Sequence, residues 1–443
     1  MNIFALSTGK GPSGIAILRL SGKDSLQISK LITKKNDLKS KEVNLCKFYD
    51  PSNGKMIDEG LLLWSPGPNS YTGEDLAEFH THGSNAVVSC FLRVLGEQEN
   101  CRLAEPGEFT KLAFQNNKMD LIEAESIGDL IHAETELQRQ QAIKLIQGNA
   151  SNHYNSLREK LVKSLSYIEA KIDFAEDDLP ENVLKEVQAS IKHVHKDIKQ
   201  ILEDQKIGEK IRDGFRISII GDVNAGKSSL LNLFSKREAA IVSEQEGTTR
   251  DVIETYLNID GYPVILADTA GIRKVKNKIE KEGIKRAINK AKDADLTLVM
   301  IDVSKKTINK DLKKLINEDC ILVFNKSDLS KKTPKNEFKK NDQILISVKN
   351  NKNIDNLIKT IKKKLSKKFM KANNILVTRE RHRAKLNAAL KEIENFLKKD
   401  QKKEIETAAE DLRLATRHLG GIVGKVDVEE ILGSIFQDFC IGK

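Results

Sequence analysis

The segment at residues 214–228 constrains the fold of this chain more than any other part of its sequence. A nearly continuous apolar run at 215–220 leads into Gly221-Asp-Val-Asn-Ala-Gly-Lys-Ser228. This fits the pattern Gly-x4-Gly-Lys-Ser/Thr, which joins a strand to a helix. The glycines let backbone N–H groups wrap around phosphates, and the helix N-terminus adds its dipole. The sequence therefore predicts a parallel α/β sheet with a phosphate-binding loop at the end of one strand.

Four further motifs indicate that the nucleotide carries guanine. Gly247-Thr-Thr-Arg-Asp251 offers a threonine hydroxyl to Mg²⁺, and Asp268-Thr-Ala-Gly271 brings a carboxylate to the metal and an N–H to the γ-phosphate. The carboxylate of Asp328, in Asn325-Lys-Ser-Asp328, can accept hydrogen bonds from N1–H and N2–H of guanine, an edge that adenine lacks. Ser347-Val-Lys349 supplies further base contacts. The order of the motifs predicts a GTP site between 214 and 350 and excludes a metabolic kinase that shares only the phosphate loop.

Individual roles follow from the chemistry of these motifs. Lys227 is expected to neutralise the β- and γ-phosphates and to act in catalysis, and Ser228 is expected to bind Mg²⁺. The predicted GTP-binding residues of these motifs are Asn224, Ala225, Gly226, Lys227, Ser228, Ser229, Gly247, Thr248, Thr249, Asp268, Thr269, Ala270, Gly271, Asn325, Lys326, Asp328, Ser347, Val348 and Lys349.

The residue after the Asp-x-x-Gly motif raises a question of mechanism. Ras-like GTPases carry a glutamine there to orient the attacking water, but this chain has Ile272. Either hydrolysis is slow, or another group supplies the base and the missing positive charge. The side-chain carbonyl of Asn224 could ligate a monovalent cation beside the phosphates.

The pattern of the chain divides it into four segments. Short apolar runs at 15–20 and 61–64 predict a mixed α+β domain, and apolar residues at helical spacing follow from about 119. One series runs from Leu184 to Ile201 and predicts a long helix, buried against its neighbours or, as an alternative, paired in a coiled coil. Short β-branched runs at 215–220, 264–267, 296–301, 321–324 and 344–346 predict parallel strands, and helical patterns return at 386–397, 405–419 and 428–439. The expected segments are 1–118, 119–213, 214–372 and 373–443, with the α/β domain inserted in a helical one.

Composition narrows the class of protein. No run approaches the roughly 18 apolar residues of a membrane span, and the first residues resemble neither a secretory signal nor a transit peptide. The five cysteines form no Cys-x-x-Cys pair, which argues against zinc or disulfides and suits a cytoplasmic protein. The net charge is +10, and residues 303–374 hold 20 basic against 7 acidic residues. This excess marks either a solvated lysine-rich surface or an RNA contact.

Several motifs outside the nucleotide site resemble those of the MnmE (TrmE) family of tRNA-modification GTPases. They include Gly14-Ile-Ala-Ile-Leu-Arg-Leu-Ser-Gly22, Tyr71-Thr-Gly-Glu-Asp75, His80-Thr-His-Gly83, Pro106-Gly-Glu-Phe109, Asn117-Lys-Met-Asp120 and Cys440-Ile-Gly-Lys443. The tail Cys-x-Gly-Lys after helices that enclose a GTPase domain is the most specific of these. Ser84 stands where the family usually has a second glycine. The resemblance covers essentially the whole chain.

The resemblance implies an N-terminal folate-binding domain that also dimerises, and a flavoprotein partner, MnmG, joined to it as a heterotetramer. It implies a shared reaction that installs a carboxymethylaminomethyl or aminomethyl group at C5 of the wobble uridine, position 34, of certain tRNAs. In that reaction 5,10-methylenetetrahydrofolate supplies the carbon, and FAD in the partner supplies the redox chemistry. GTP hydrolysis with Mg²⁺ and K⁺ drives association and dissociation of the GTPase domains.

The resemblance also assigns residues by matching position. Asn224, Ser243, Gln245 and Thr248 would hold K⁺, and Ser228 and Thr249 would hold Mg²⁺. Glu280 would orient the hydrolytic water, and Cys440 would act near the one-carbon unit. The family's folate contacts match Arg19, Glu78, Lys118 and Lys443. The chemistry is suitable, because the three cations can bind the glutamyl carboxylates of folate and the Glu78 carboxylate can accept from the pterin N–H groups.

A ribosome-assembly or RNA-binding GTPase switch is the alternative interpretation. Such proteins append basic RNA-binding domains to the GTPase domain and have no use for a Cys-x-Gly-Lys tail. The two ends of the chain therefore favour tRNA modification.

Overall fold

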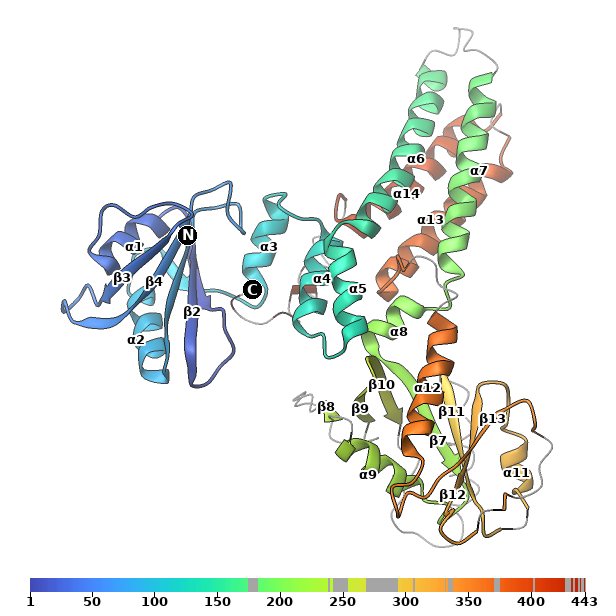
Figure 1. Ribbon diagram of the computed structural model, residues 1–443. Helices are drawn as coiled ribbons and strands as arrows, with labels where there is room; N and C mark the ends of the chain where they lie inside the picture. The colour runs from blue at the N-terminus through green and yellow to red at the C-terminus, as the bar shows by residue number, and fades with distance from the viewer. Residues whose placement is uncertain are drawn as a thin grey trace, which may run out of the picture. The chain divides into compact units, whose positions relative to one another are not determined.

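The computed structural model describes residues 1–173, 182–237, 240–241, 254–267, 294–305, 307–330, 332–333, 338–369, 375–400 and 403–426, with 432, 435, 436, 439 and 442 near the C-terminus. The chain forms two compact units, each with its own sheet (Figure 1). Unit 1 comprises Met1–Gly128, Leu145–Phe174 and Glu404–Lys443; unit 2 comprises Asp129–Lys144 and Ala175–Lys403. The predicted α+β and α/β parts with flanking helices are confirmed. The four expected segments do not correspond one for one to the two units.

Unit 1 is built on a six-stranded sheet with the strand order β3-β4-β5-β2-β1-β6. Its strands are β1 Asn2–Leu6, β2 Ser13–Ser21, β3 Val43–Tyr49, β4 Met56–Ser65, β5 Leu76–Gly83 and β6 Cys101–Leu103. Its helices are α1 Ser25–Thr33, α2 Asn85–Gly96, α3 Glu108–Gln115, α4 Leu121–Ile131, which extends into unit 2, α6 Asn149–Asp173 and α14 Ile405–Val423.

The core of this sheet follows from the alternation of its strands. Leu18 and Leu20 on β2, Leu62 on β4 and Phe79 on β5 are buried on one face, where they pack against Phe91 of α2. Ser84 begins α2, because its hydroxyl accepts a hydrogen bond from the Val87 N–H at 3.2 Å. Serine is therefore a favourable N-cap at the position where the family usually has glycine.

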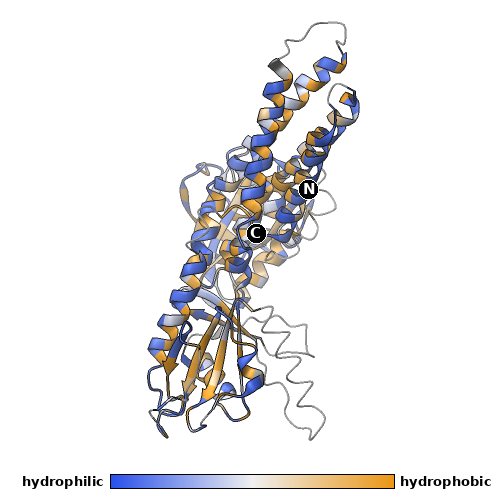
Figure 2. Ribbon diagram, turned by 90° about the vertical axis from the view of Figure 1, so that its right-hand side faces the viewer, coloured by the Kyte–Doolittle hydropathy of each residue, from blue (hydrophilic) through white to orange (hydrophobic). Residues whose placement is uncertain are grey.

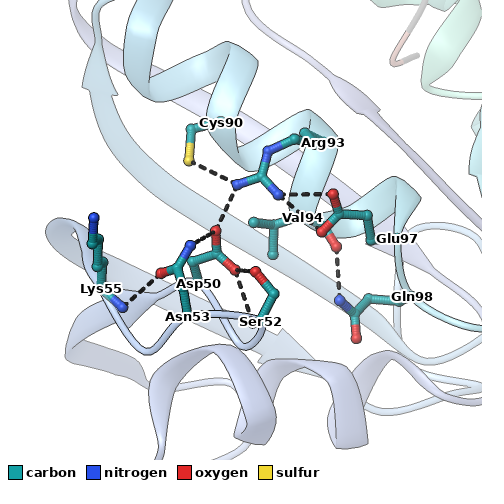
Figure 3. Close-up of polar contacts among 9 residues, drawn as sticks. All are labelled: Asp50, Ser52, Asn53, Lys55, Cys90, Arg93, Val94, Glu97 and Gln98. Atoms are coloured by element: carbon teal, nitrogen blue, oxygen red, sulfur yellow. Dashed lines mark hydrogen bonds and ion pairs between the residues drawn. The ribbon is translucent and has the colours of Figure 1, made fainter.

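A polar cluster ties the β3–β4 turn to α2 (Figure 3). The buried carboxylate of Asp50 accepts hydrogen bonds from the Ser52 N–H and hydroxyl, and from Asn53. Arg93 on α2 donates to Asp50 at 2.6 Å and to Glu97 at 2.8 Å. The hydrogen bond from Ser52, and then that from Arg93, holds the pKa of Asp50 well below its usual range. The cluster fixes the hairpin on the helix by charge-assisted hydrogen bonds.

The C-terminal segment returns to unit 1. Phe436 and Phe439 are buried against Leu121 and Ala124 of α4. A Cβ on Gly107 would meet the Phe436 carbonyl at 2.8 Å, and Gly107 has φ +67°, so no other residue fits there without strain. Aromatic packing of Phe436 and Phe439 therefore holds this segment against α4.

Unit 2 contains a seven-stranded, mainly parallel sheet with the order β13-β12-β11-β7-β10-β9-β8. Its strands are β7 Phe215–Gly221, β8 Ala240–Ile241, β9 Glu254–Ile259, β10 Tyr262–Ala267, β11 Leu296–Asp302, β12 Cys320–Asn325 and β13 Asp342–Leu345. Its helices are α5 Glu136–Ile146, most of which belongs to this unit, α7 Asn182–Leu202, α8 Ile207–Asp213, α9 Lys227–Arg237, α11 Lys310–Lys313, α12 Ile354–Phe369 and α13 Glu380–Lys398. The strands at the bottom of Figure 2 have the hydrophobic colour expected of a sheet covered on both faces.

The five strands expected from their apolar runs all form, as β7, β10, β11, β12 and β13. The long helix expected from Leu184 to Ile201 also forms, as α7, and its stripe Val187, Ile191, Val194 and Ile198 is buried. α13 packs against α7. Burial within the chain, rather than a coiled-coil seam, therefore accounts for the stripe.

A cluster of ion pairs fixes the position of the short helix α8, which immediately precedes β7 in the sequence. Arg383 on α13 is buried and donates to both carboxylate oxygens of Glu209, at 2.8 and 2.7 Å, and to Asp204 at 2.7 Å. Gly208 lies so close to α13's leading segment that a Cβ would meet the Val377 carbonyl at 2.0 Å. α8 leads directly into β7, so this cluster fixes where the nucleotide-binding sheet begins.

In the part of the chain that the structure describes, no helix combines the length and apolar character needed to cross a membrane.

Candidate functional site

The loop after β7 has the backbone geometry that a phosphate cradle needs. Asn224 has φ +62° and Gly226 has φ +100°, so the chain turns back on itself before α9. A Cβ on Gly226 would lie 2.2 Å from the Asn325 amide nitrogen, and one on Gly221 would lie 2.4 Å from the Met300 carbonyl. Glycine is therefore required at both positions, because backbone and side chains from the neighbouring strands approach too closely for a side chain.

The ammonium group of Lys227 contacts the backbone of the phosphate loop itself. The Lys227 ammonium donates to the carbonyls of Gly221 and Asp222, at 2.7 and 2.8 Å. Asp222 in turn accepts from Lys305 at 2.9 Å. Ser228 and Ser229 follow in the first turn of α9 with exposed side chains. Loop N–H groups, an ammonium and a hydroxyl thus gather at one helix N-terminus, which is the arrangement that binds phosphate and Mg²⁺.

Asn325, at the end of β12, joins the phosphate loop to the base-binding loop. Its amide nitrogen donates to the Ala225 carbonyl at 2.9 Å, and its amide oxygen accepts from the Val348 N–H at 3.1 Å. The side chain is buried. One amide therefore fixes the spacing between the part of the site that holds phosphate and the part that holds the base.

The base-reading residues come together on the other side of Asn325. The Ser347 hydroxyl donates to the Asp328 carboxylate at 2.6 Å, and this bond lowers the pKa of Asp328. The Lys326 ammonium lies 2.6 Å from the Asp302 carboxylate. Burial raises the pKa of Asp302, but the hydrogen bonds from Lys326 and Ser304 lower this pKa by more. Asp328 is thus held ionised, as an acceptor of two guanine N–H groups must be.

Several predicted residues lie outside the described part of the chain. They are Ser243, Gln245, Gly247, Thr248, Thr249, Asp268, Thr269, Ala270, Gly271, Ile272, Glu280, Cys440 and Lys443. The described residues Asn224, Ala225, Gly226, Lys227, Ser228, Ser229, Asn325, Lys326, Asp328, Ser347, Val348 and Lys349 gather at the carboxyl ends of β7, β12 and β13.

A second polar cluster lies on the face of the unit 1 sheet that α3 covers. Arg19 on β2 stands opposite Glu78 on β5, and its Nε and Nη2 donate to one Glu78 oxygen at 3.0 and 2.7 Å. The guanidinium lies 5.1 Å from the ring centroid of Tyr71 and 5.5 Å from that of Phe109. Two rings and a carboxylate hold this cation in place, which suits recognition of a flat or anionic ligand.

The C-terminal segment reaches the same cluster. The Ser7 hydroxyl donates to the Gly442 carbonyl at 2.9 Å, and Arg19 Nη1 donates to the same oxygen at 3.4 Å. A Cβ on Gly442 would lie 2.3 Å from the Leu6 carbonyl. Lys118, the fourth residue of the expected folate set, is exposed and donates to the Pro68 carbonyl at 2.8 Å. The structure therefore brings Arg19, Glu78 and the tail together and leaves Lys118 bound to a neighbouring loop.

No pattern in the sequence indicates the role of Ser7, or the stacking of Tyr71 and Phe109 on Arg19. The two aromatics lie in the quoted motifs, but their role depends on the cross-strand register and on the position of α3. The link through the Asn325 side chain depends likewise on tertiary structure. Within the described residues, no group of three His, Cys, Asp or Glu side chains could hold a metal ion.

Comparisons with known proteins cover the whole chain. One family model, "GTP-binding protein TrmE N-terminus", matches residues 2–118, and another, "MnmE helical domain", matches 121–440. A protein named tRNA modification GTPase MnmE from Pelagibacter ubique is 58% identical over 100% of both chains. Proteins of the same name from Rickettsia bellii and Parvibaculum lavamentivorans are 44% and 43% identical over 100% of this chain and 99% of theirs. A solved structure of Aquifex aeolicus Era bound to GDP and aluminium fluoride is 26% identical, over 40% of this chain and 66% of that chain, with a TM-score of 0.25.

Proposed function

Because the chain belongs to the MnmE family of tRNA modification GTPases, we propose that it couples GTP hydrolysis to folate-dependent modification of the tRNA wobble uridine. It binds GTP and hydrolyses it in tRNA modification. The observation that carries the finer proposal is the cluster of Arg19, Glu78 and Gly442, which lies on a different sheet from the nucleotide site. The chain thus has a place for a second, non-nucleotide ligand.

At the nucleotide site, this chain's residues bind and orient. With GTP bound, the Lys227 ammonium exchanges the carbonyls of its own loop for the β- and γ-phosphates. Ser228 and Thr249 would hold Mg²⁺, which would supply positive charge beside the transferred phosphate. Asp328 accepts from the guanine edge while Asn325 keeps the base loop at a fixed distance from the phosphate loop. Glu280 orients the attacking water.

K⁺ fits the same site. Asn224 is exposed and, among the described residues, its side chain has no hydrogen-bond partner. Its amide oxygen is therefore available as a hard oxygen ligand beside the phosphates, with Ser243, Gln245 and Thr248 completing the shell. A cation there would supply the positive charge that an arginine finger supplies in other GTPases, and Glu280 would take the water-orienting role that Ile272 cannot fill.

The cluster of unit 1 fits a reduced folate. Glu78 offers a carboxylate for the pterin N–H groups, Arg19, Lys118 and Lys443 offer cations for the glutamyl carboxylates, and Tyr71 and Phe109 supply aromatic faces. 5,10-Methylenetetrahydrofolate supplies the one-carbon unit when bound. Cys440, two residues before Gly442 in the sequence, is the residue that we propose acts near that unit.

Assembly completes the proposal. Val43 and Leu45 on the edge strand β3 stand opposite Leu63 and Leu61 on β4, and Val43 is 68% and Leu45 62% exposed. Adjacent apolar side chains at a sheet edge favour pairing with a second copy, as a homodimer. MnmG, carrying FAD, joins this dimer as a heterotetramer. We also propose the division into 1–118, 119–213, 214–372 and 373–443, and a cytoplasmic location.

One experiment tests the proposed function. Mass spectrometry of wobble uridines in tRNA from a strain lacking this protein should show loss of the carboxymethylaminomethyl or aminomethyl group, and the gene should restore it. An Arg19→Ala gene should fail to restore it while the purified variant hydrolyses GTP at the wild-type rate. Normal uridines in the deletion strain contradict the proposal.

A further inference from the structure

The lysines of α12 fall into two sets. On its inner side, Leu357, Ile361 and Leu365 are buried against the sheet of unit 2. Beside this apolar stripe, each of three lysines pairs with a carboxylate of the sheet's loops. Lys362 lies 2.6 Å from Asp260, Lys364 lies 3.5 Å from Asp342, and Lys368 lies 2.8 Å from Asp319.

Lys359, Lys363 and Lys367 form the second set, named here the lysine ridge. All three are exposed, and within the described residues none of the three ammonium groups has an ion pair or a hydrogen bond. They recur every four residues, so their Cα atoms are spaced about 6 Å apart along one side of the helix. Such a row of cations matches the repeat of phosphates along a nucleic-acid strand.

The charge around the ridge has one sign. From residue 356 to the end of α12 there is no acidic residue, and the single carboxylate of the first turn, Asp355, lies 2.7 Å from Arg237. The carboxylates that face α12 from the sheet, Asp260, Asp342 and Asp319, are taken by the first set of lysines. The ridge therefore carries uncompensated positive charge along the outer side of α12.

We propose that the lysine ridge binds the phosphate backbone of the tRNA substrate. The family's substrate is a polyanion, and a row of exposed, unpaired ammonium groups is complementary to it. The ridge positions the tRNA and reads no sequence, since ammonium groups contact phosphates and not base edges. An RNA strand along the ridge lies toward the amino ends of β12 and β13, whereas the guanine pocket lies at their carboxyl ends, so the proposed contact is separate from the nucleotide site. The contact is independent of the folate cluster, so failure here would leave the proposed modification reaction standing.

The test compares two variants of one helix with the same change in net charge. Lys359→Gln, Lys363→Gln and Lys367→Gln remove the ridge; Lys362→Gln, Lys364→Gln and Lys368→Gln remove the paired set. Binding of an unmodified tRNA transcript to the full chain with GDP is measured over a series of NaCl concentrations. Loss of three phosphate contacts should lower the slope of log K against log salt by about 2 to 3. It should also weaken binding at low salt by roughly tenfold or more.

The paired-set variant should keep the wild-type slope, and changing the ridge lysines to arginine should restore it. Because the ridge is exposed, thermal unfolding and K⁺-stimulated GTP hydrolysis should be unchanged in its glutamine variant. A wild-type slope in the ridge variant would overturn the proposal and leave the ridge to an acidic protein partner or to solvent. Equal losses in both variants would also overturn it, since they would reflect net charge alone. If the paired-set variant unfolds, the arginine variant of the ridge still tests the proposal, because its slope of log K against log salt must match that of the wild type.

Discussion

Asn224 is the residue that should make GTP hydrolysis depend on K⁺. Its exposed amide lies in a left-handed turn of the phosphate loop, and the chain lacks the glutamine of Ras-like enzymes. We expect hydrolysis to be slow in NaCl and much faster in KCl. A charge-compensating group of this kind is worth about 10³–10⁵ in rate.

Asn224→Ala should therefore lose most of the response to K⁺ and keep its nucleotide affinity. Steady-state phosphate release in the two salts measures the first, and titration with a fluorescent GDP analogue measures the second. Equal rates of the wild type in the two salts would rule out a bound cation.

Asp328 should determine the choice of base. Its carboxylate is oriented by the 2.6 Å bond from Ser347, and it accepts two hydrogen bonds that adenine cannot donate. Asp328→Asn should lose GTP affinity and gain affinity for xanthosine triphosphate, whose acceptor at the same edge suits an amide donor. Competition binding of the two nucleotides measures this, with the exposed Lys352→Gln, outside the predicted site, as a control for surface charge. Unchanged affinity for GTP would mean that the base binds elsewhere.

At the scale of elements, the β3–β4 hairpin should govern the acid stability of unit 1. The hydrogen bonds from Ser52 and Arg93 lower the pKa of Asp50. The stability they confer is present above the unfolded carboxyl's pKa of about 3.9 and is lost as the pH falls through the lower folded pKa.

Asp50→Asn should accordingly be less stable than wild type at neutral pH, and the difference should vanish in strong acid. Trp64, the single tryptophan, lies on β4 and reports unfolding of this sheet by its fluorescence. The exposed Glu59→Gln is the matched control and should keep the wild-type pH profile. Parallel profiles of Asp50→Asn and wild type would contradict the assigned role.

The cluster on α8 should govern the stability of unit 2. Arg383→Met leaves Glu209 and Asp204 buried with less compensation, at a cost of about 3–5 kcal/mol in the free energy of unfolding. Urea unfolding followed by loss of bound fluorescent nucleotide measures it. The exposed Lys391→Met on the same helix should cost far less, and equal losses would mean that the buried pairs contribute little.

Elements differ in how far the sequence predicts them. β7 and β10 to β13 were expected because buried parallel strands are nearly continuous apolar runs. β9 was missed, because Glu254–Ile259 has neither a continuous apolar run nor a strict alternation of polar and apolar residues. The phosphate loop and the guanine motif are local in sequence, so their residues could be named. The contacts of Asn325, Arg19 and Ser7 cross between elements and could not.

At the scale of the whole molecule, the two sheets should carry separable activities. The C-terminal segment is held on unit 1 by Phe436, Phe439 and the Gly442 carbonyl. Deleting residues 440–443 should abolish uridine modification and weaken folate binding, while K⁺-stimulated hydrolysis stays near wild type. Gly442→Ala should do the same more mildly, because its Cβ would collide with the Leu6 carbonyl. Normal modified uridine with the deletion would refute the folate site.

The amide of Asn325 limits how the nucleotide site can vary among relatives. It contacts the backbone of Ala225 and Val348 and neither of their side chains, so those two positions can change without disturbing the link. Position 325 has no such freedom, since aspartate lacks the donor and glutamine is one methylene too long. One side chain therefore keeps in register two loops, at Ala225 and Val348, that lie 123 residues apart in the sequence.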